Sequence, residues 1–232
     1  RRERERLQRR AEMIDAARSI FARIGYAQTT LEEVAELAEF GKGTIYNYFP
    51  NKEALFASVL EETFRGFNTI FSETLSSDLP FRKKIRLCAE RSLRHTFSNP
   101  EGMALMIREG HYLRRDNPLM QLHPQLVGAL AATIAAEQAT ANETIDAPPD
   151  RVAALLMNMV MGQFINRLQL CFRDVALEAS NVDPEPDPGT AAGEVFAMLN
   201  RGDLDHDVEV ATDLVCGIFF GGFYSKHERT TS

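Results

Sequence analysis

The stretch EFGKGTIYNYFPNKEALF, residues 39–56, limits the fold of this chain more than any other. It predicts a helix of about two turns from Lys42 to Phe49. Pro50 must end this helix, because proline cannot continue a helix and disfavours helical geometry at the residue before it. Asn51 can then cap a new helix whose apolar residues recur at helical spacing. The stretch therefore indicates a short helix, a sharp break and a longer helix.

Two helices are predicted before this stretch. Apolar residues recur every three or four positions from Ile14 to Ile24, which places them on one helix face, and Gly25 supplies a stop. Thr30 and Glu33 have the spacing of a capping box and mark the start of a short second helix. Two short helices around a tight turn, packed on a longer first helix, are typical of a helix-turn-helix protein that reads DNA.

The third helix offers groups that suit a DNA backbone and its bases. Glycine on both sides of Lys42 would let the backbone approach phosphates closely, and Lys42 itself adds a positive charge. Ile45 is expected to face the core together with Tyr48 or Phe49. Asparagine and threonine can bond base edges, and tyrosine can bond phosphate. The side chains expected to project outward are those of Thr44, Tyr46 and Asn47.

A phosphate-binding loop is the rival interpretation of Gly-Lys-Gly-Thr, and the spacing argues against it. Such a loop requires glycine five residues before the Gly-Lys pair and serine or threonine directly after the lysine. Glu36 and Gly43 occupy these two positions. The motif therefore fails twice.

The net charge of −7 would argue against a nucleic-acid partner, but the charge is unevenly distributed. Residues 1–52 contain ten basic and eight acidic residues, whereas the rest of the chain contains 16 basic and 25 acidic residues. An anionic polymer should therefore meet the N-terminal part. The arginine-rich start, RRERERLQRR, is interpreted either as a disordered tail or as an arm that reaches the minor groove.

Neither catalysis nor metal binding is predicted. Cys88, Cys171 and Cys216 are far apart among apolar residues, which favours core thiols and a reducing cytoplasm over a disulfide framework. The five histidines show no pair at i, i+4, and the G-x-S-x-G and H-E-x-x-H motifs are missing. We expect no enzyme activity, no cofactor and no metal. The start of the chain lacks the apolar core of a signal peptide, and no apolar run approaches the roughly 20 residues that span a bilayer.

The remainder of the chain, from about residue 65, also reads as helical. Pro80, Pro100 and Pro118 mark helix starts, and a further helix is predicted from about residue 149 to residue 173. The last helix, DVEVATDLVCGIFFGGFYSK, is apolar nearly all round and needs burial on more than one side. No strand alternation is visible, so the fold class is all-α.

Residues 29–56, TTLEEVAELAEFGKGTIYNYFPNKEALF, resemble the DNA-binding domain of the tetracycline-repressor (TetR) family of bacterial transcriptional regulators. The resemblance runs from about Ile14 to Leu60, roughly a fifth of the chain, and fades beyond it. It implies a homodimer with a helix-turn-helix domain at residues 1–53 and an effector-binding and dimerisation domain at residues 54–232. It further implies a repressor that a small effector releases from a palindromic DNA operator.

The resemblance also assigns DNA contacts residue by residue. Three departures from the family pattern stand in the turn between the two short helices: Glu39 where glycine is frequent, Phe40 at a small apolar position, and Gly41 in place of a serine cap. A non-glycine residue in left-handed geometry costs on the order of 1 kcal/mol. A helical protein-interaction module that no longer reads DNA is therefore kept as the alternative. The implied phosphate contacts are Thr30, Tyr46, Tyr48 and Lys52, and the implied base-facing residues are Lys42, Gly43, Thr44 and Asn47.

Effector and dimer contacts are predicted in the C-terminal part. Methionine and aromatic side chains suit an adaptable apolar pocket, although they suit an ordinary core as well, and the effector is expected to be lipophilic. The last two long helices resemble those that pair across the family dimer, although burial inside one subunit is the alternative. The candidate pocket residues are Met103, Met106, His111, Tyr112, Met157, Met161, Phe164 and Phe172. The candidate dimer residues are Gly217, Phe220, Gly221 and Phe223.

Overall fold

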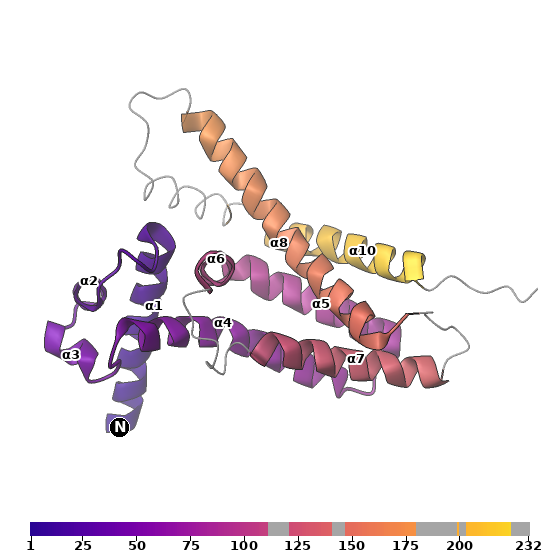
Figure 1. Ribbon diagram of the computed structural model, residues 1–232, viewed down its shortest axis with the longest axis horizontal. Helices are drawn as coiled ribbons and strands as arrows, with labels where there is room; N and C mark the ends of the chain where they lie inside the picture. Colours follow the sequence, from indigo (N-terminus) through magenta and orange to yellow (C-terminus); the bar gives the residue numbers. More distant parts are fainter. Residues whose placement is uncertain (111–120, 141–146, 180–198, 200–202, 224–232) are drawn as a thin grey trace, which may run out of the picture. The chain divides into compact units, whose positions relative to one another are not determined.

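The computed structural model describes residues 1–110, 121–140, 147–179, 199 and 203–223, and every regular element in these ranges is a helix (Figure 1). This confirms the predicted all-α class. The helices are α1 (Arg2–Ile24), α2 (Leu31–Leu37), α3 (Lys42–Tyr46), α4 (Lys52–Leu75), α5 (Phe81–Ser98), α6 (Pro100–Glu109), α7 (Leu122–Thr140), α8 (Pro149–Ala179) and α10 (Leu204–Phe223).

The chain forms two compact units that are not two consecutive segments. The first unit contains α1, α2, α3, α6 and the start of α4; the second contains α5, α7, α10, the rest of α4 and most of α8. Helices α4 and α8 therefore contribute to both units. The predicted domain boundary after residue 53 falls within α4 and stays a prediction.

Helix α1 begins much earlier than the apolar pattern alone indicated. Its first turns are formed by the arginine-rich start, so this segment is neither a tail nor an extended arm. Pairs of opposite charge at i, i+4, such as Arg1 and Glu5 at 3.0 Å, support the solvated turns. The helix ends at Gly25 as predicted, with φ 86° and its N–H donating to the Phe21 carbonyl.

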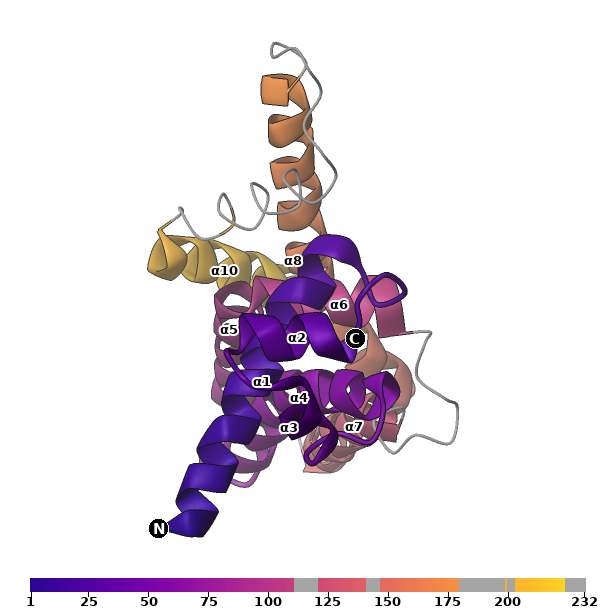
Figure 2. The same ribbon diagram turned by 90° about the vertical axis from the view of Figure 1, so that its left-hand side faces the viewer.

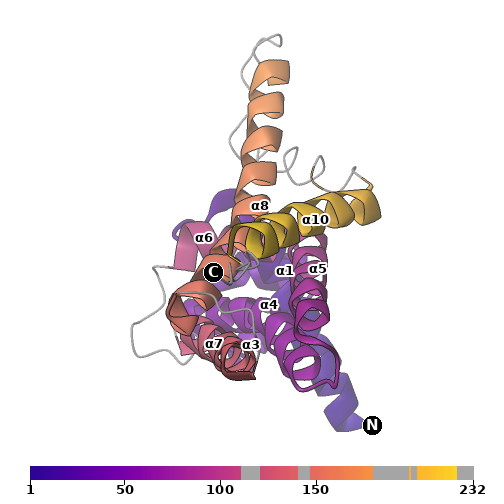
Figure 3. The ribbon, with the colours of Figure 1, turned by 90° about the vertical axis from the view of Figure 1, so that its right-hand side faces the viewer.

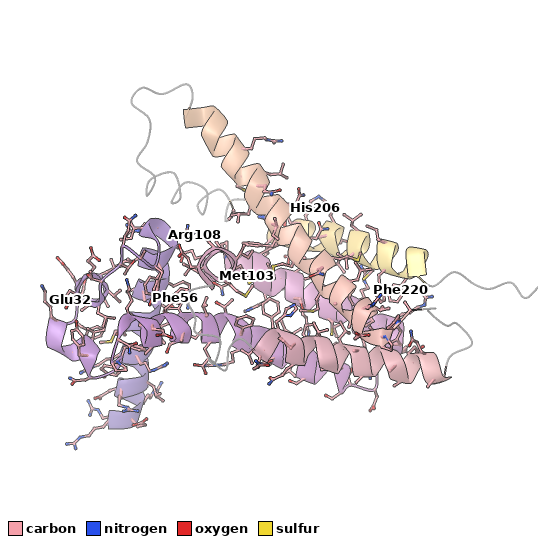
Figure 4. All side chains as sticks on the ribbon, viewed as in Figure 1. Glu32, Phe56, Met103, Arg108, His206 and Phe220 are labelled. Atoms are coloured by element: carbon pink, nitrogen blue, oxygen red, sulfur yellow. The ribbon has the colours of Figure 1, made fainter. Side chains whose placement is uncertain are left out.

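An aromatic cluster forms the centre of the first unit. The rings of Phe21 and Phe56 meet edge to face with centroids 5.3 Å apart, and Tyr26 lies 4.8 Å from Phe56. Phe56, labelled in Figure 4, comes from the start of α4 and is completely buried, as is Phe21 on α1. The cluster therefore fixes α1, the α1–α2 connection and the start of α4 together.

Polar contacts hold α1 on its other sides. Arg18 donates to Glu62 of α4 at 2.9 Å. Arg108 at the end of α6 donates to the carbonyls of Phe21 and Ala22 at 2.9 and 3.2 Å. These carbonyls belong to the last turn of α1. The guanidinium is a second donor to the Phe21 carbonyl, beside the Gly25 N–H, and supplies a donor to the Ala22 carbonyl.

In the second unit α5 packs against α10 (Figure 3). Leu93 of α5 and Phe219 of α10 are fully buried, and Arg86 pairs with Asp213 across the two helices at 2.7 Å. Burial raises the pKa of the Cys88 thiol to about 11, which fits the predicted core role. No helix in the described ranges is both long and apolar enough to cross a membrane.

The turn between α2 and α3 carries the backbone strain that the sequence predicted. Glu39 has φ 58°, a left-handed conformation that non-glycine residues rarely adopt. The N–H of the next residue, Phe40, donates a hydrogen bond to the Ala35 carbonyl at 2.8 Å, which closes the turn.

We predict that Glu39→Gly raises the free energy of unfolding by up to about 1 kcal/mol, because glycine adopts positive φ without steric cost. Chemical denaturation monitored by circular dichroism measures this change. The matched control is Glu36→Gly in the last turns of α2, which should lower the free energy of unfolding by about 1 kcal/mol. Equal destabilisation by both variants would contradict the strain at Glu39.

Candidate nucleic-acid interface

Helix α2 is positioned by its cap and its apolar face. The Thr30 hydroxyl accepts a hydrogen bond from the Glu33 N–H at 3.2 Å, and the Glu33 carboxylate accepts from the Thr30 N–H at 2.7 Å, so the predicted capping box is confirmed. Leu31 and Val34 are buried beneath the helix. Figure 2 shows α2 and α3 in front of α1, on which α2 packs.

Helix α3 is shorter than predicted, because it ends at Tyr46 and continues only as turns. Ile45 is fully buried and Phe49 is 2% exposed, which is the inward face that the spacing predicted. The phenol of Tyr46, by contrast, is 49% exposed. The predicted base-facing residues Lys42, Gly43 and Asn47 are exposed, while Thr44 and the predicted phosphate ligand Tyr48 are half-buried.

The Tyr46 hydroxyl does not point freely to solvent. It donates to a carboxylate oxygen of Glu32 on α2 at 2.7 Å. This bond lowers the pKa of Glu32, and the nearby positive charge of Lys42 lowers it further. The same bond raises the pKa of the Tyr46 hydroxyl. Glu32, which is labelled in Figure 4, is therefore an ionised group among the predicted DNA contacts.

Lys52 differs from the exposed lysine on α3. Its ammonium group donates to the carbonyls of Tyr26 and Ala27 at 2.8 and 3.1 Å and lies 4.5 Å from the centre of the Tyr26 ring. It therefore ties the start of α4 to the connection between α1 and α2. The predicted phosphate role of Lys52 stays a prediction, and the structure adds an anchoring role.

Asn51 and Arg10 complete the support behind α3. The Asn51 side chain accepts a hydrogen bond from the Ala54 N–H at 2.8 Å, so the predicted cap of α4 is confirmed. The guanidinium of Arg10 lies 5.2 Å from the centre of the Phe49 ring and donates to Ser58 at 2.9 Å. The short helix is thus presented on a surface that α1 and α4 hold from behind.

The predicted effector residues fall in different parts of the chain. Met103 of α6, in the first unit, is fully buried, and Met106 is half-buried. In the second unit Phe164 of α8 is fully buried. Met157 and Met161 on the same helix are half-buried. His111, Tyr112 and the side chain of Phe172 lie outside the described residues.

The predicted dimer residues divide in the same way. Gly217 and Gly221 are exposed on α10. Phe220 is half-buried, with the Arg82 guanidinium 4.6 Å from the centre of its ring. The side chain of Phe223 lies outside the described residues. Sequence reasoning missed three apolar side chains on the same helix that are about half exposed: Val210, Leu214 and Ile218.

The first unit thus defines a helix-turn-helix protein, in which α2 and α3 enclose a tight turn and α3 presents an exposed polar face. The sequence family described as bacterial regulatory proteins of the tetR family matches residues 13–59, which are α1 from Met13, α2, α3 and the start of α4. Residues 13–59 therefore form a helix-turn-helix domain of the TetR type.

Relatives and solved structures agree with this assignment. The chain is similar to the HTH-type transcriptional regulator YhgD of Bacillus subtilis, with 35% identity over 79 residues, 34% of this chain and 41% of that protein. It is also similar to the HTH-type transcriptional repressor NicS of Pseudomonas putida, with 30% identity over 139 residues, 56% of this chain and 63% of that protein. The matches therefore span less than two thirds of either relative. The fold is similar to that of the ketosteroid transcriptional regulator KstR2 of Mycobacterium tuberculosis, with a TM-score of 0.67, 15% identity and coverage of 94% of this chain and 96% of that chain.

We predict that Lys52→Ala lowers the free energy of unfolding by about 1–2 kcal/mol, because two carbonyl groups lose a charged donor. Thermal or chemical denaturation measures the change. Lys42→Ala is the matched control, since Lys42 is exposed and its removal should change stability by less than about 0.5 kcal/mol. Equal stability of the two variants would show that Lys52 is not an anchor.

Proposed function

We propose that this chain is a sequence-specific DNA-binding transcriptional regulator, a repressor that a small lipophilic effector releases from a palindromic operator. The observation that carries the proposal is the exposed polar face of α3, with Lys42, Tyr46 and Asn47 outward over a buried Ile45. The N-terminal part, with ten basic and eight acidic residues in residues 1–52, carries the net positive charge that attracts phosphate. This activity belongs in the bacterial cytoplasm, where the DNA is.

In the proposed complex the exposed groups have different tasks. Asn47 and Thr44 can bond base edges in the major groove, which gives sequence preference. Lys42 and Tyr46 can hold phosphate or a base acceptor, and Gly43 has no neighbouring atom near the place of a Cβ, so the backbone can approach closely. Tyr48 is half-buried and the hydroxyl of Thr30 is bonded to Glu33, so these two residues are proposed to contribute less.

An apolar cavity in the second unit supports a lipophilic effector. It measures about 310 Å³ and lies between the second half of α4 and α7, lined by Phe71, Leu75 and Leu126 with Asn68, Ser72 and Gln125 at polar positions. A volume of this size suits a small ligand, and apolar walls with a few polar groups are usual for such sites. The predicted methionines and phenylalanine of α6 and α8 remain candidate effector contacts in addition to the residues that line this cavity.

Release from DNA is proposed to act through α4. This helix starts at the Asn51 cap behind α3 and continues as one wall of the cavity. The recognition helices of a dimer must lie about 34–36 Å apart to enter successive major grooves. An effector that binds one spacing more tightly than the other shifts the population and thereby lowers the DNA affinity.

The second copy required by a palindrome is proposed to bind at α10. Val210, Leu214 and Ile218 recur every four residues and are each about half exposed, which gives one apolar stripe along the helix. Gly217 and Gly221 stand on the same exposed side and would permit close approach of a partner helix.

The DNA reading is tested by selecting bound duplexes from a random pool. We predict that the wild type enriches one palindromic sequence, and that Lys42→Ala combined with Asn47→Ala lowers the affinity for it by about tenfold or more, since a base contact contributes roughly 1–3 kcal/mol. Lys83→Ala, an exposed lysine on α5, is the control and should keep full affinity. A folded wild-type dimer that enriches nothing would favour the protein-interaction alternative.

The dimer surface is tested by a single charge. We predict that Leu214→Glu raises the dimer dissociation constant by about tenfold or more, because a carboxylate would be buried in an apolar interface. Sedimentation velocity over a concentration series measures the dissociation constant. Leu79→Glu, at an exposed apolar position before α5, should leave it unchanged. A Leu214→Glu protein as dimeric as the wild type would refute the interface at α10.

A further inference from the structure

A carboxylate accepts the hydrogen bond that the proposed interface assigns to a DNA phosphate. Glu32 on α2 accepts the hydrogen bond of the Tyr46 hydroxyl on α3 at 2.7 Å, although the two residues are 14 positions apart. The α2–α3 turn that brings them together is closed by the hydrogen bond from Phe40 to Ala35. The pair is therefore a product of the helix-turn-helix geometry rather than of one helix.

The surroundings keep Glu32 ionised. Its hydrogen bond with Tyr46 and the charge of Lys42 both lower its pKa. One of the groups proposed to hold DNA, the Tyr46 hydroxyl, is thus already bonded to an anion of the chain itself, and the charge of a second, Lys42, acts on the same anion.

A DNA phosphate would compete with this anion. A phenol has one O–H and can donate one hydrogen bond, so Tyr46 cannot serve Glu32 and a phosphate oxygen at once. Glu32 and the phosphate also repel each other as like charges, and DNA binding must offset both effects. The cost is the same at every DNA sequence, because phosphates carry no sequence information.

We propose that Glu32 is an intramolecular competitor of DNA phosphate for the Tyr46 hydroxyl, and that it holds the DNA affinity of this chain below the value that its other contacts allow. This inference rests on the proposed DNA binding. It assigns Glu32 a function that a merely solvated acidic residue would not have.

Helix α2 itself supplies a matched control. Glu36 lies one turn after Glu32 on the same helix, is exposed, and forms no side-chain contact among those described with Tyr46. Glu33 is unsuitable, because its carboxylate closes the capping box with Thr30. Glu32→Gln and Glu36→Gln each remove one negative charge near the DNA, but only the first also replaces the charged acceptor of the Tyr46 hydroxyl by a neutral amide oxygen, which competes more weakly.

The experiment compares four variants by fluorescence anisotropy on the labelled duplex that the wild type enriches: Glu32→Gln, Glu36→Gln, Tyr46→Phe, and Glu32→Gln with Tyr46→Phe. We expect Glu32→Gln to tighten binding by about threefold to tenfold, a range typical of one hydrogen bond, and Glu36→Gln by less than about twofold. In the Tyr46→Phe background the effect of Glu32→Gln should fall to that of Glu36→Gln, because there is no hydroxyl left to release. Thermal melting of each variant verifies that the fold is kept.

Other results overturn the inference. Equal effects of Glu32→Gln and Glu36→Gln would show that only charge matters, and weaker binding by Glu32→Gln would show that Glu32 itself contacts DNA or positions Tyr46 for it. An undiminished effect of Glu32→Gln in the Tyr46→Phe background would exclude the hydroxyl. These three results leave the proposed function intact, whereas failure of the wild type to enrich any duplex removes the proposed function and the inference with it.

Discussion

The packing of Phe21 against Phe56 is the contact on which the candidate DNA interface depends. It joins α1 to the start of α4 and encloses Tyr26, whose backbone carbonyl receives Lys52. Burial of an aromatic side chain of this size contributes about 3–5 kcal/mol when truncation to alanine is the measure. Helices α2 and α3 contain only seven and five residues, so they cannot be stable alone. Their stability depends on the packing of α1 against the start of α4. The exposed face of α3 is therefore held in place through the buried residues beneath it, Ile45 and Phe49.

The cations of the first unit divide into those that build the framework and those that remain available. Arg10, Arg18, Lys52 and Arg108 each satisfy a carbonyl, a hydroxyl or a carboxylate of another segment. Lys42, by contrast, is exposed on α3. A count of charges along the sequence does not distinguish these two sets of cations. Only the exposed cations, such as Lys42, can bind DNA without giving up a contact that stabilises the fold. This is why stability and DNA affinity should respond differently to Lys52→Ala and Lys42→Ala.

Local chemistry made much of this fold predictable from the sequence. The Thr30 capping box, the Gly25 stop and the Asn51 cap each involve residues within four positions, and the structure contains all three. The inward face of α3 followed equally from spacing. The Glu32–Tyr46 bond was not predicted, because it depends on the angle between two helices. Tertiary packing also determines the anchoring by Lys52 and the cavity between α4 and α7. The recurrence of apolar residues every three or four positions therefore cannot predict them.

The competitor role of Glu32 bears on how such a regulator can be released. An effector shifts the equilibrium only by the difference between its affinities for the two states. A protein that holds DNA more tightly therefore needs an effector with a larger difference. A carboxylate that competes at each recognition helix lowers the DNA binding free energy twice in a dimer, and it does so without removing any residue that reads bases. In the proposed complex sequence preference remains with Asn47, Thr44 and Lys42, while Glu32 adjusts the sequence-independent part. In the proposed complex a residue of α2 can therefore adjust the affinity without changing the residues of α3 that are proposed to read bases.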